Sequence, residues 1–156
     1  MKTKFKNYLF ILLAMMFTLF IAGCDMLEAL PGDSNNLEIT ISKEGSYDDF
    51  ESVAAYIHVY GELPSNFISK REAKKLGWEP GKDLWDYAEG KSIGGDVFGN
   101  YEGSLPEANG RKWYECDINY KGGKRGADRI VFSNDGLIYG TSDHYETFTL
   151  YYGEEE

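Results

Sequence analysis

The residues best suited to chemistry lie between positions 113 and 129. Because side chains alternate across an extended strand, Glu115 and Asp117 are expected on the same sheet face. A glycine-rich loop follows, and Arg125 and Arg129 come after it or at its end. Guanidinium groups bind phosphate through paired hydrogen bonds, and a positioned carboxylate can transfer a proton. Two interpretations stay open: a half-buried strand with neutralised acids, or a site for an anionic substrate in which Glu115 transfers a proton.

Two other residues fit the second interpretation. Lys70 falls in the first turn of a predicted helix, where the helix dipole disfavours a cation unless an anion binds there. His144 lies in a predicted turn and is one of two histidines in the chain. A glutamate and a histidine flanked by basic side chains would form an acid–base pair with clamps for phosphate. Cys116 is expected to be a buried structural thiol, because no histidine lies near it in sequence.

Local patterns predict the helices. An apolar stripe at positions 50, 53, 54 and 57 predicts a helix that begins after Asp49 and ends at Gly61. A capping box of Ser69 and Glu72 predicts a second short helix ending near Gly77. Residues 83–88 are predicted to form a third short helix.

The second half of the chain is rich in β-branched and aromatic residues, interrupted by turn residues. Residues 134–136 (Asn-Asp-Gly) predict a hairpin between strands at 130–133 and 137–141, and residues 148–152 a last strand. Residues 37–42 are a candidate for an earlier short strand. Helices followed by strands predict an α+β fold, with N-terminal helices packed on one face of a C-terminal antiparallel sheet.

The N-terminus has the features of an export signal. Lysines at positions 2, 4 and 6 precede an apolar run over residues 8–21, which is short for a membrane span. The run ends in residues 21–24 (IAGC), which resemble a bacterial lipobox and imply cleavage before Cys24 and a lipid on its thiol. An ordinary signal peptide is the alternative. The predicted organisation is a signal at 1–23, a tether at 24–45, a domain at 46–152 and an acidic tail at 153–156.

The charge balance limits the classes of partner. The predicted signal holds three of the 16 basic residues and no acid, so the mature chain would carry 13 basic against 26 acidic residues. Such a charge argues against non-specific binding of nucleic acid or anionic membrane. If Cys24 carries a lipid, Cys116 has no intramolecular partner and no disulfide framework supports the fold.

Seven short segments of the chain carry a further signal. They are residues 61–64 (GELP), 69–73 (SKREA), 76–78 (LGW), 90–96 (GKSIGGD), 117–120 (DINY), 128–130 (DRI) and 141–148 (TSDHYETF). Together they resemble the barnase family of bacterial guanyl-preferring microbial ribonucleases. The resemblance runs collinearly from Asp49 to Leu150, with one residue fewer in the loop after Trp78.

The resemblance implies a barnase-like α+β fold and metal-free cleavage of single-stranded RNA, with no cofactor. A 2′,3′-cyclic phosphate would form first and then be opened to a 3′-phosphate. The implied general base is Glu115 and the implied general acid is His144. The implied supporting groups are Lys70, Arg125, Arg129 and Tyr145 at the phosphate, Asp117 holding the arginines, and Asp96 as structural support.

Residues 98–102 match the family's base-reading loop. The loop consists of Phe98, Gly99, Asn100, Tyr101 and Glu102. Glu102 would accept hydrogen bonds from guanine N1 and N2, which adenine cannot supply. The chain departs from the family at Tyr101, where an arginine is usual, and at Gly99, Tyr114 and Cys116. The base could stack on Tyr101 instead.

The resemblance also implies partners and a location. A monomeric, extracellular enzyme is expected, secreted or anchored to the outer face of the membrane through Cys24. A small acidic barstar-like inhibitor is the implied protein partner. The alternative function is a membrane-anchored RNA- or protein-binding lipoprotein that keeps the fold with weak or no catalysis. The retention of all five implied catalytic and phosphate-binding side chains, Glu115, His144, Lys70, Arg125 and Arg129, favours the enzyme.

Overall fold

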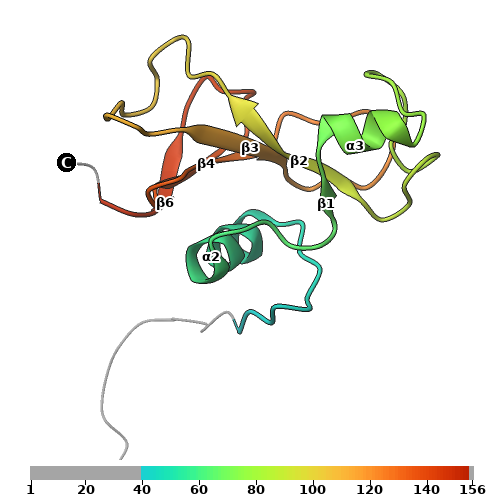
Figure 1. Ribbon diagram of the computed structural model, residues 1–156, viewed down its shortest axis with the longest axis horizontal. Coiled ribbons are helices and arrows are strands. Elements are labelled where there is room, and N and C mark those ends of the chain that lie inside the picture. The colour runs from blue at the N-terminus through green and yellow to red at the C-terminus, as the bar shows by residue number, and fades with distance from the viewer. Residues whose placement is uncertain (1–39, 155–156) are drawn as a thin grey trace, which may run out of the picture. The chain divides into compact units, whose positions relative to one another are not determined.

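The computed structural model describes residues 40–154, and elements are labelled as in Figure 1. The predicted signal, Cys24 and most of the predicted tether lie outside the described residues. Between residues 40 and 154, no helix has the length and apolar character needed to cross a membrane.

Both capped helices form as predicted. Helix α2 (Phe50–Tyr60) begins after Asp49, whose carboxylate accepts a hydrogen bond from the Ser52 amide at 2.8 Å. It ends at Gly61, which has a left-handed backbone with φ of 68°. Helix α3 (Lys70–Lys75) begins with the predicted capping box, in which Ser69 and Glu72 each bind the other's backbone amide.

The predicted third helix is wrong, because residues 83–88 form turns. The Asp83 carboxylate accepts the Trp85 amide at 2.9 Å, and the Tyr120 hydroxyl accepts the Leu84 amide at the same distance. These bonds fix the start of a single turn, in which the Ala88 amide donates to the Leu84 carbonyl at 2.8 Å, and the turn does not continue into a helix.

Six strands form one sheet in sequence order. The parallel pair β1 (Phe67–Ile68) and β2 (Ser92–Phe98) is followed by antiparallel neighbours throughout. The remaining strands are β3 (Trp113–Asp117), β4 (Arg129–Ser133), β5 (Ile138–Thr141) and β6 (Thr149–Tyr152). The predicted α+β class and the 134–136 hairpin are confirmed. The predicted strand at 37–42 is not seen over its described residues, 40–42.

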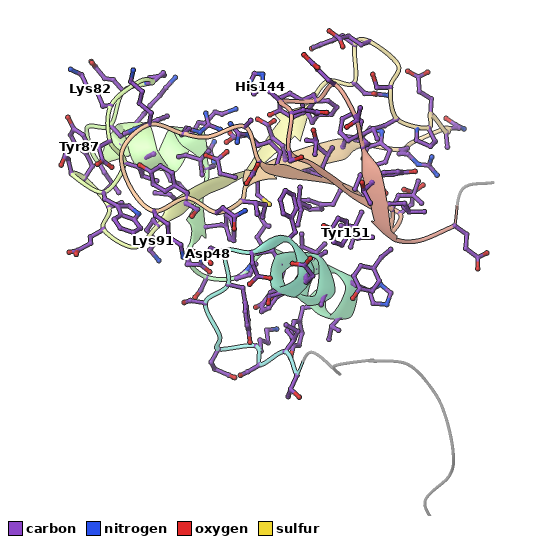
Figure 2. The ribbon with its side chains drawn as sticks, turned by 180° about the vertical axis from the view of Figure 1, so that it is seen from behind. Asp48, Lys82, Tyr87, Lys91, His144 and Tyr151 are labelled. Atoms are coloured by element: carbon purple, nitrogen blue, oxygen red, sulfur yellow. The ribbon has the colours of Figure 1, made fainter. Side chains whose placement is uncertain are left out.

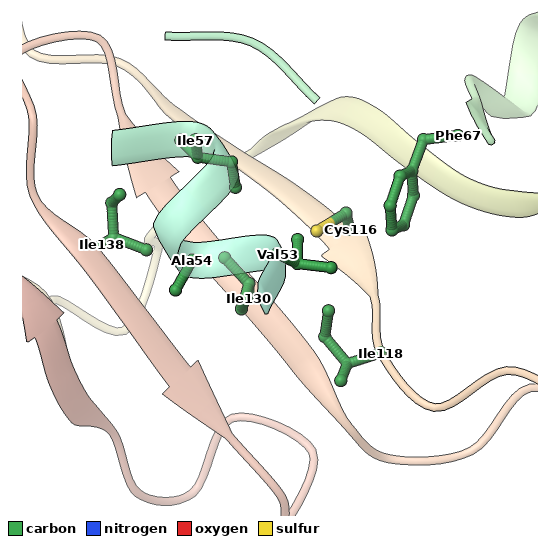
Figure 3. Packing of buried hydrophobic residues seen from close by; sticks show 8 residues of the cluster. All are labelled: Val53, Ala54, Ile57, Phe67, Cys116, Ile118, Ile130 and Ile138. Carbon is green, nitrogen blue, oxygen red and sulfur yellow. The ribbon is translucent and has the colours of Figure 1, made fainter. Parts of the chain in front are cut away.

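Helix α2 covers one face of the sheet with an apolar core (Figures 1 and 3). Figure 3 shows Cys116 and Ile130 turned toward α2, where they meet Val53 and Ala54. Burial of such side chains is the main favourable term in folding. The cluster consists of Val53, Ala54, Ile57, Phe67, Cys116, Ile118, Ile130 and Ile138.

Residues 41–43, which fall in the predicted tether, pack against α2. The Tyr56 hydroxyl donates to the carbonyl of Lys43 at 3.0 Å, and the Tyr60 hydroxyl donates to the carbonyl of Ile41 at 3.1 Å. These two hydrogen bonds join residues 41 and 43 to α2.

The opposite face of the sheet carries a different set of side chains. Trp113, Val131 and Tyr139 form a second apolar cluster there, covered by Leu105 from the loop between β2 and β3. Figure 2 shows His144 on this side of the sheet, away from α2 and Tyr151. Glu115 and Asp117 of strand β3 point to the same side, so this polar face of the sheet carries an apolar cluster as well.

Candidate active site

Glu115 is the centre of the polar face. It lies in the middle of β3 and is 9% exposed. Its Oε1 accepts a hydrogen bond from Lys70 Nζ at 2.7 Å, and its Oε2 accepts one from the Tyr145 hydroxyl at 2.5 Å. Burial raises the pKa of Glu115, but these two hydrogen bonds and the charges of Lys70 and Arg125 outweigh it, so the pKa lies below its ordinary value. Glu115 is therefore ionised at neutral pH and competent to accept a proton.

Lys70 reaches Glu115 because α3 begins beside β2. The register of β2 against β3 shifts between Gly94 and Asp96, and the intervening Gly95 has φ of 88°. After this bulge, Asp96 accepts the Lys70 backbone amide at 2.9 Å. The carboxylate thus occupies the anion-favouring start of α3, while the Lys70 side chain extends to Glu115.

Asp117 lies two residues beyond Glu115 and binds two arginines. It accepts hydrogen bonds from Arg125 Nε at 2.5 Å and Arg125 Nη2 at 2.6 Å, a bidentate pair that raises the pKa of Arg125. Arg129 Nε lies 3.0 Å from the same carboxylate, although its N–H is not aligned for a hydrogen bond. Arg129 is 4% exposed, so Asp117 compensates a buried charge.

His144 and Tyr145 come from the loop between β5 and β6. Both have left-handed backbones, with φ of 60° and 74°. The Tyr145 ring stacks on Phe98 with ring centres 5.2 Å apart. Burial first and the hydrogen bond to Glu115 second raise the pKa of the Tyr145 hydroxyl, so it stays protonated and donates to Glu115.

A cavity of about 420 Å³ joins the predicted base-reading loop to Glu115 and His144. Within the loop, the buried Asn100 side chain both donates to and accepts from the Leu105 backbone, at 2.9 and 3.0 Å. These bonds fix the loop around the left-handed Asn100. The Tyr101 ring is 98% exposed at the rim of the cavity.

A second cavity, of about 500 Å³, meets the first at His144. Its ionisable lining holds no carboxylate and consists of Lys82, Lys124, Arg125, Arg129 and His144. Figure 2 shows Lys82 and His144 on the same side of the molecule. A strongly acidic chain therefore presents a locally basic surface next to Glu115, suited to phosphate.

A larger cavity, about 640 Å³, lies elsewhere, beside the C-terminal end of α2. It holds Tyr114 and Phe132 on the α2 side of the sheet and none of the residues that the sequence predicts for catalysis. Size alone therefore does not locate the site, and the clustering of ionisable side chains does.

The structure brings the predicted site residues together from separate parts of the chain. Lys70, Glu115 and Tyr145 are in direct contact, and His144 and residues 98–102 line the cavity with Glu115. Sequence reasoning missed Lys82 and Lys124, which only the fold places beside Arg125. It also missed Asp143, although an acid among turn hydroxyls is a recognisable signal.

No group of three His, Cys, Asp or Glu side chains suited to a metal ion occurs among the residues that the structure describes. The candidate site combines the carboxylate of Glu115, the imidazole of His144 and several cations, with Asp117 holding two of those cations.

Comparison with known proteins gives a consistent result. The sequence model of the ribonuclease family matches residues 50–152. A ribonuclease from Bacillus intermedius is 57% identical over 101 residues, which cover 64% of this chain and 62% of the relative. A ribonuclease from Heyndrickxia coagulans is 57% identical over 100 residues, covering 64% of this chain and 92% of the relative. The guanyl-specific ribonuclease St of Saccharopolyspora erythraea is 40% identical over 57 residues, covering 36% of this chain and 56% of the relative.

Proposed function

The chain belongs to the ribonuclease family, and on that premise we propose that it is an extracellular endoribonuclease that cleaves single-stranded RNA after guanosine. The observation that carries the proposal is the ionised Glu115, held between Lys70 and Tyr145 and sharing one cavity with His144. A carboxylate ready to accept a proton and an imidazole able to donate one are the two groups that transesterification of RNA requires.

In the first step, Glu115 takes the proton of the ribose 2′-hydroxyl, and the 2′-oxygen attacks the adjacent phosphorus. His144 protonates the departing 5′-oxygen, which leaves a 2′,3′-cyclic phosphate. In the second step the roles reverse: His144 takes a proton from water, the hydroxide opens the cyclic phosphate, and Glu115 returns its proton to the 2′-oxygen. The product is a 3′-phosphate.

The basic groups stabilise the charge that develops on the phosphoryl oxygens. Arg125 and Arg129 are held by Asp117, so they need little reorganisation when the phosphate binds. Lys70 is the group that can exchange partners, because its ammonium lies between Glu115 and open solvent, with a side chain 36% exposed. The basic cavity continues from His144 toward Lys82 and Lys124, which gives the leaving strand a cationic path.

Preference for guanine rests on the cavity rim. Glu102 lines the cavity and carries a carboxylate that can accept from guanine N1 and N2. Adenine has an acceptor at N1 and no N2 donor, so the same carboxylate would repel it. The fixed loop around Asn100 would hold backbone amides for guanine O6.

The remaining parts of the proposal concern location and partners. The sequence of residues 1–24 supports release from the cell, or retention on the outer face of the cell membrane through a lipid on Cys24. An acidic barstar-like inhibitor would be attracted by the same cations that bind phosphate, and Tyr101 in place of arginine removes one of its expected contacts.

The test is product analysis with a dinucleotide. The purified protein is incubated with GpU or ApU, with and without EDTA, and the products are separated. The proposal expects 2′,3′-cyclic guanosine phosphate from GpU, unaffected by EDTA, and much slower cleavage of ApU. A folded protein that binds GpU without cleaving it would instead favour a binding lipoprotein with the same fold.

A further inference from the structure

The loop that carries His144 and Tyr145 closes around one carboxylate, that of Asp143. Its Oδ1 accepts hydrogen bonds from the Thr141 hydroxyl at 2.8 Å, from the Glu146 amide at 3.0 Å and from the Thr147 amide at 2.9 Å. Its Oδ2 accepts from the Thr147 hydroxyl at 2.5 Å. Four donors from both sides of the loop thus converge on one side chain.

The backbone inside this ring of hydrogen bonds is strained. His144 and Tyr145 are consecutive non-glycine residues with positive φ, a conformation that L-amino acids rarely adopt. Such conformations persist only when the surrounding structure determines them, and they concentrate at functional sites. Here the hydrogen bonds to Asp143 link the residues on either side of the strained pair.

The hydrogen bonds also continue from Asp143 to Glu115. The Thr141 hydroxyl, which donates to Asp143, accepts the Tyr145 amide at 3.1 Å. The Tyr145 hydroxyl then donates to Glu115. One carboxylate therefore orients the loop that supplies both the histidine and the tyrosine that holds Glu115.

We propose that Asp143 is a positioning residue for catalysis, which holds His144 over the cavity and Tyr145 against Glu115. The proposal rests on the ribonuclease function proposed above. Hydrogen bonds from Thr147 and Thr141 lower the pKa of Asp143 to about 2, so its carboxylate is charged, and acts only as an acceptor, across the neutral and mildly acidic range.

Asp143→Asn is the direct test, because the amide has the shape of the carboxylate but carries no charge and only one acceptor oxygen, so the four donors cannot all keep a charged acceptor. Glu146→Gln is the matched control: it removes one negative charge from the same loop, and the Glu146 side chain is exposed. Thr147→Val is a milder variant that keeps Asp143 and removes one hydroxyl donor. Thermal unfolding establishes that each variant is folded.

Two substrates separate positioning from general damage. GpU needs a proton on its leaving 5′-oxygen, whereas a guanosine 3′-aryl phosphate releases an aryl oxide that needs none. Displacing a general acid typically costs about 10²- to 10⁴-fold on the substrate that depends on it. We expect Asp143→Asn to lower kcat/KM on GpU by about 100-fold, with a much smaller loss on the aryl phosphate. The aryl-phosphate loss should be no larger than that of Tyr145→Phe.

Several outcomes would overturn the proposal. Equal losses on both substrates would mean that Asp143 supports the fold and not His144. Equal kcat/KM values for Asp143→Asn and Glu146→Gln would mean that only loop charge matters. If the unaltered protein cleaved neither substrate, the proposed ribonuclease function would fail separately. Hydrogen exchange at the Tyr145 and Thr147 amides, and the His144 ring resonances, would then decide whether Asp143 orders the loop.

Discussion

The two faces of strand β3 show how one element serves stability and chemistry at once. Cys116 points toward α2 and lies among aliphatic side chains, in contact with Ile130 and Val53. Glu115 and Asp117 point the other way. Glu115 accepts hydrogen bonds from an ammonium and a hydroxyl group, and Asp117 pairs with guanidinium groups. On the first face, any side chains of suitable volume stabilise the fold. On the second face, the site depends on hydrogen bonds and ion pairs between particular atoms.

This difference changes what a substitution should do. Apolar burial is non-directional, so loss on the α2 face should appear as lower stability with intact chemistry. Polar groups on the other face depend on one another, so loss there exposes an unpaired charge or removes a proton acceptor. Five predictions test this separation, in order of decreasing effect.

Glu115→Gln should have the largest effect on the polar face. The amide keeps the shape of the side chain but cannot accept a proton from the 2′-hydroxyl, so we expect kcat/KM for GpU to fall by about 10²- to 10⁴-fold. The free energy of unfolding, from urea denaturation, should change far less. Glu51→Gln, at an exposed position on α2, is the control. A tenth or more of the original kcat/KM would show that Glu115 is not the base.

Asp117→Asn should lower the free energy of unfolding although Asp117 lies on the polar face, because this residue also supports the structure. Arg125 and Arg129 both depend on its carboxylate, and removing one partner of a buried ion pair costs about 3–5 kcal/mol. Asp135→Asn is the matched control, since its pair with Arg111 is partly exposed and should be worth less than about 1 kcal/mol. Similar unfolding free energies for the two variants would refute a special role for Asp117.

Ile130→Ala should have the complementary effect on the α2 face. Ile130 is 0% exposed, and such truncations cost about 2–5 kcal/mol. Below the unfolding transition, kcat/KM for GpU should stay unchanged, because Glu115 and its partners lie on the opposite side of the sheet. A loss of activity in the folded variant would mean that the faces are coupled.

The sequence predicted those parts of the structure that depend on residues close to one another in the chain. Asp49, Gly61 and the Ser69–Glu72 box were sufficient for both helices, because capping acts within four residues. The pattern at 83–88 could not show that the segment stops after a single turn, whose start is fixed by the Tyr120 hydroxyl 36 positions away. Spacing could not show that Lys70 contacts Glu115, 45 positions later. The resemblance to a known family suggested the roles of these residues, which stay predictions until measured.

Tyr145→Phe should produce an effect on pH dependence more than on rate. The hydroxyl of Tyr145 is one of the groups that lower the pKa of Glu115. A carboxylate with a lowered pKa is ionised above its folded pKa, so activity should be lost only as pH falls below the ordinary glutamate value of about 4.3. The variant should shift the acidic limb of kcat/KM to higher pH. If the acidic limb does not move in a Tyr145→Phe variant of normal stability, the hydrogen bond from Tyr145 does not lower the pKa of Glu115.

Tyr101→Arg should have the smallest effect on kcat/KM. It tests the electrostatic field of the whole molecule. The chain carries a formal charge of −10, which opposes the approach of RNA, while the cations beside Glu115 act only at short range. Because Tyr101 is exposed at the cavity rim, an arginine there should raise kcat/KM for a longer RNA on the order of threefold at low salt, with little change in kcat. Tyr101→Gln removes the ring without adding charge and should not show this gain. An increase that persists at about 1 M salt, where charges beyond about 3 Å are screened, would assign the effect to direct contact with the base and not to attraction of the RNA.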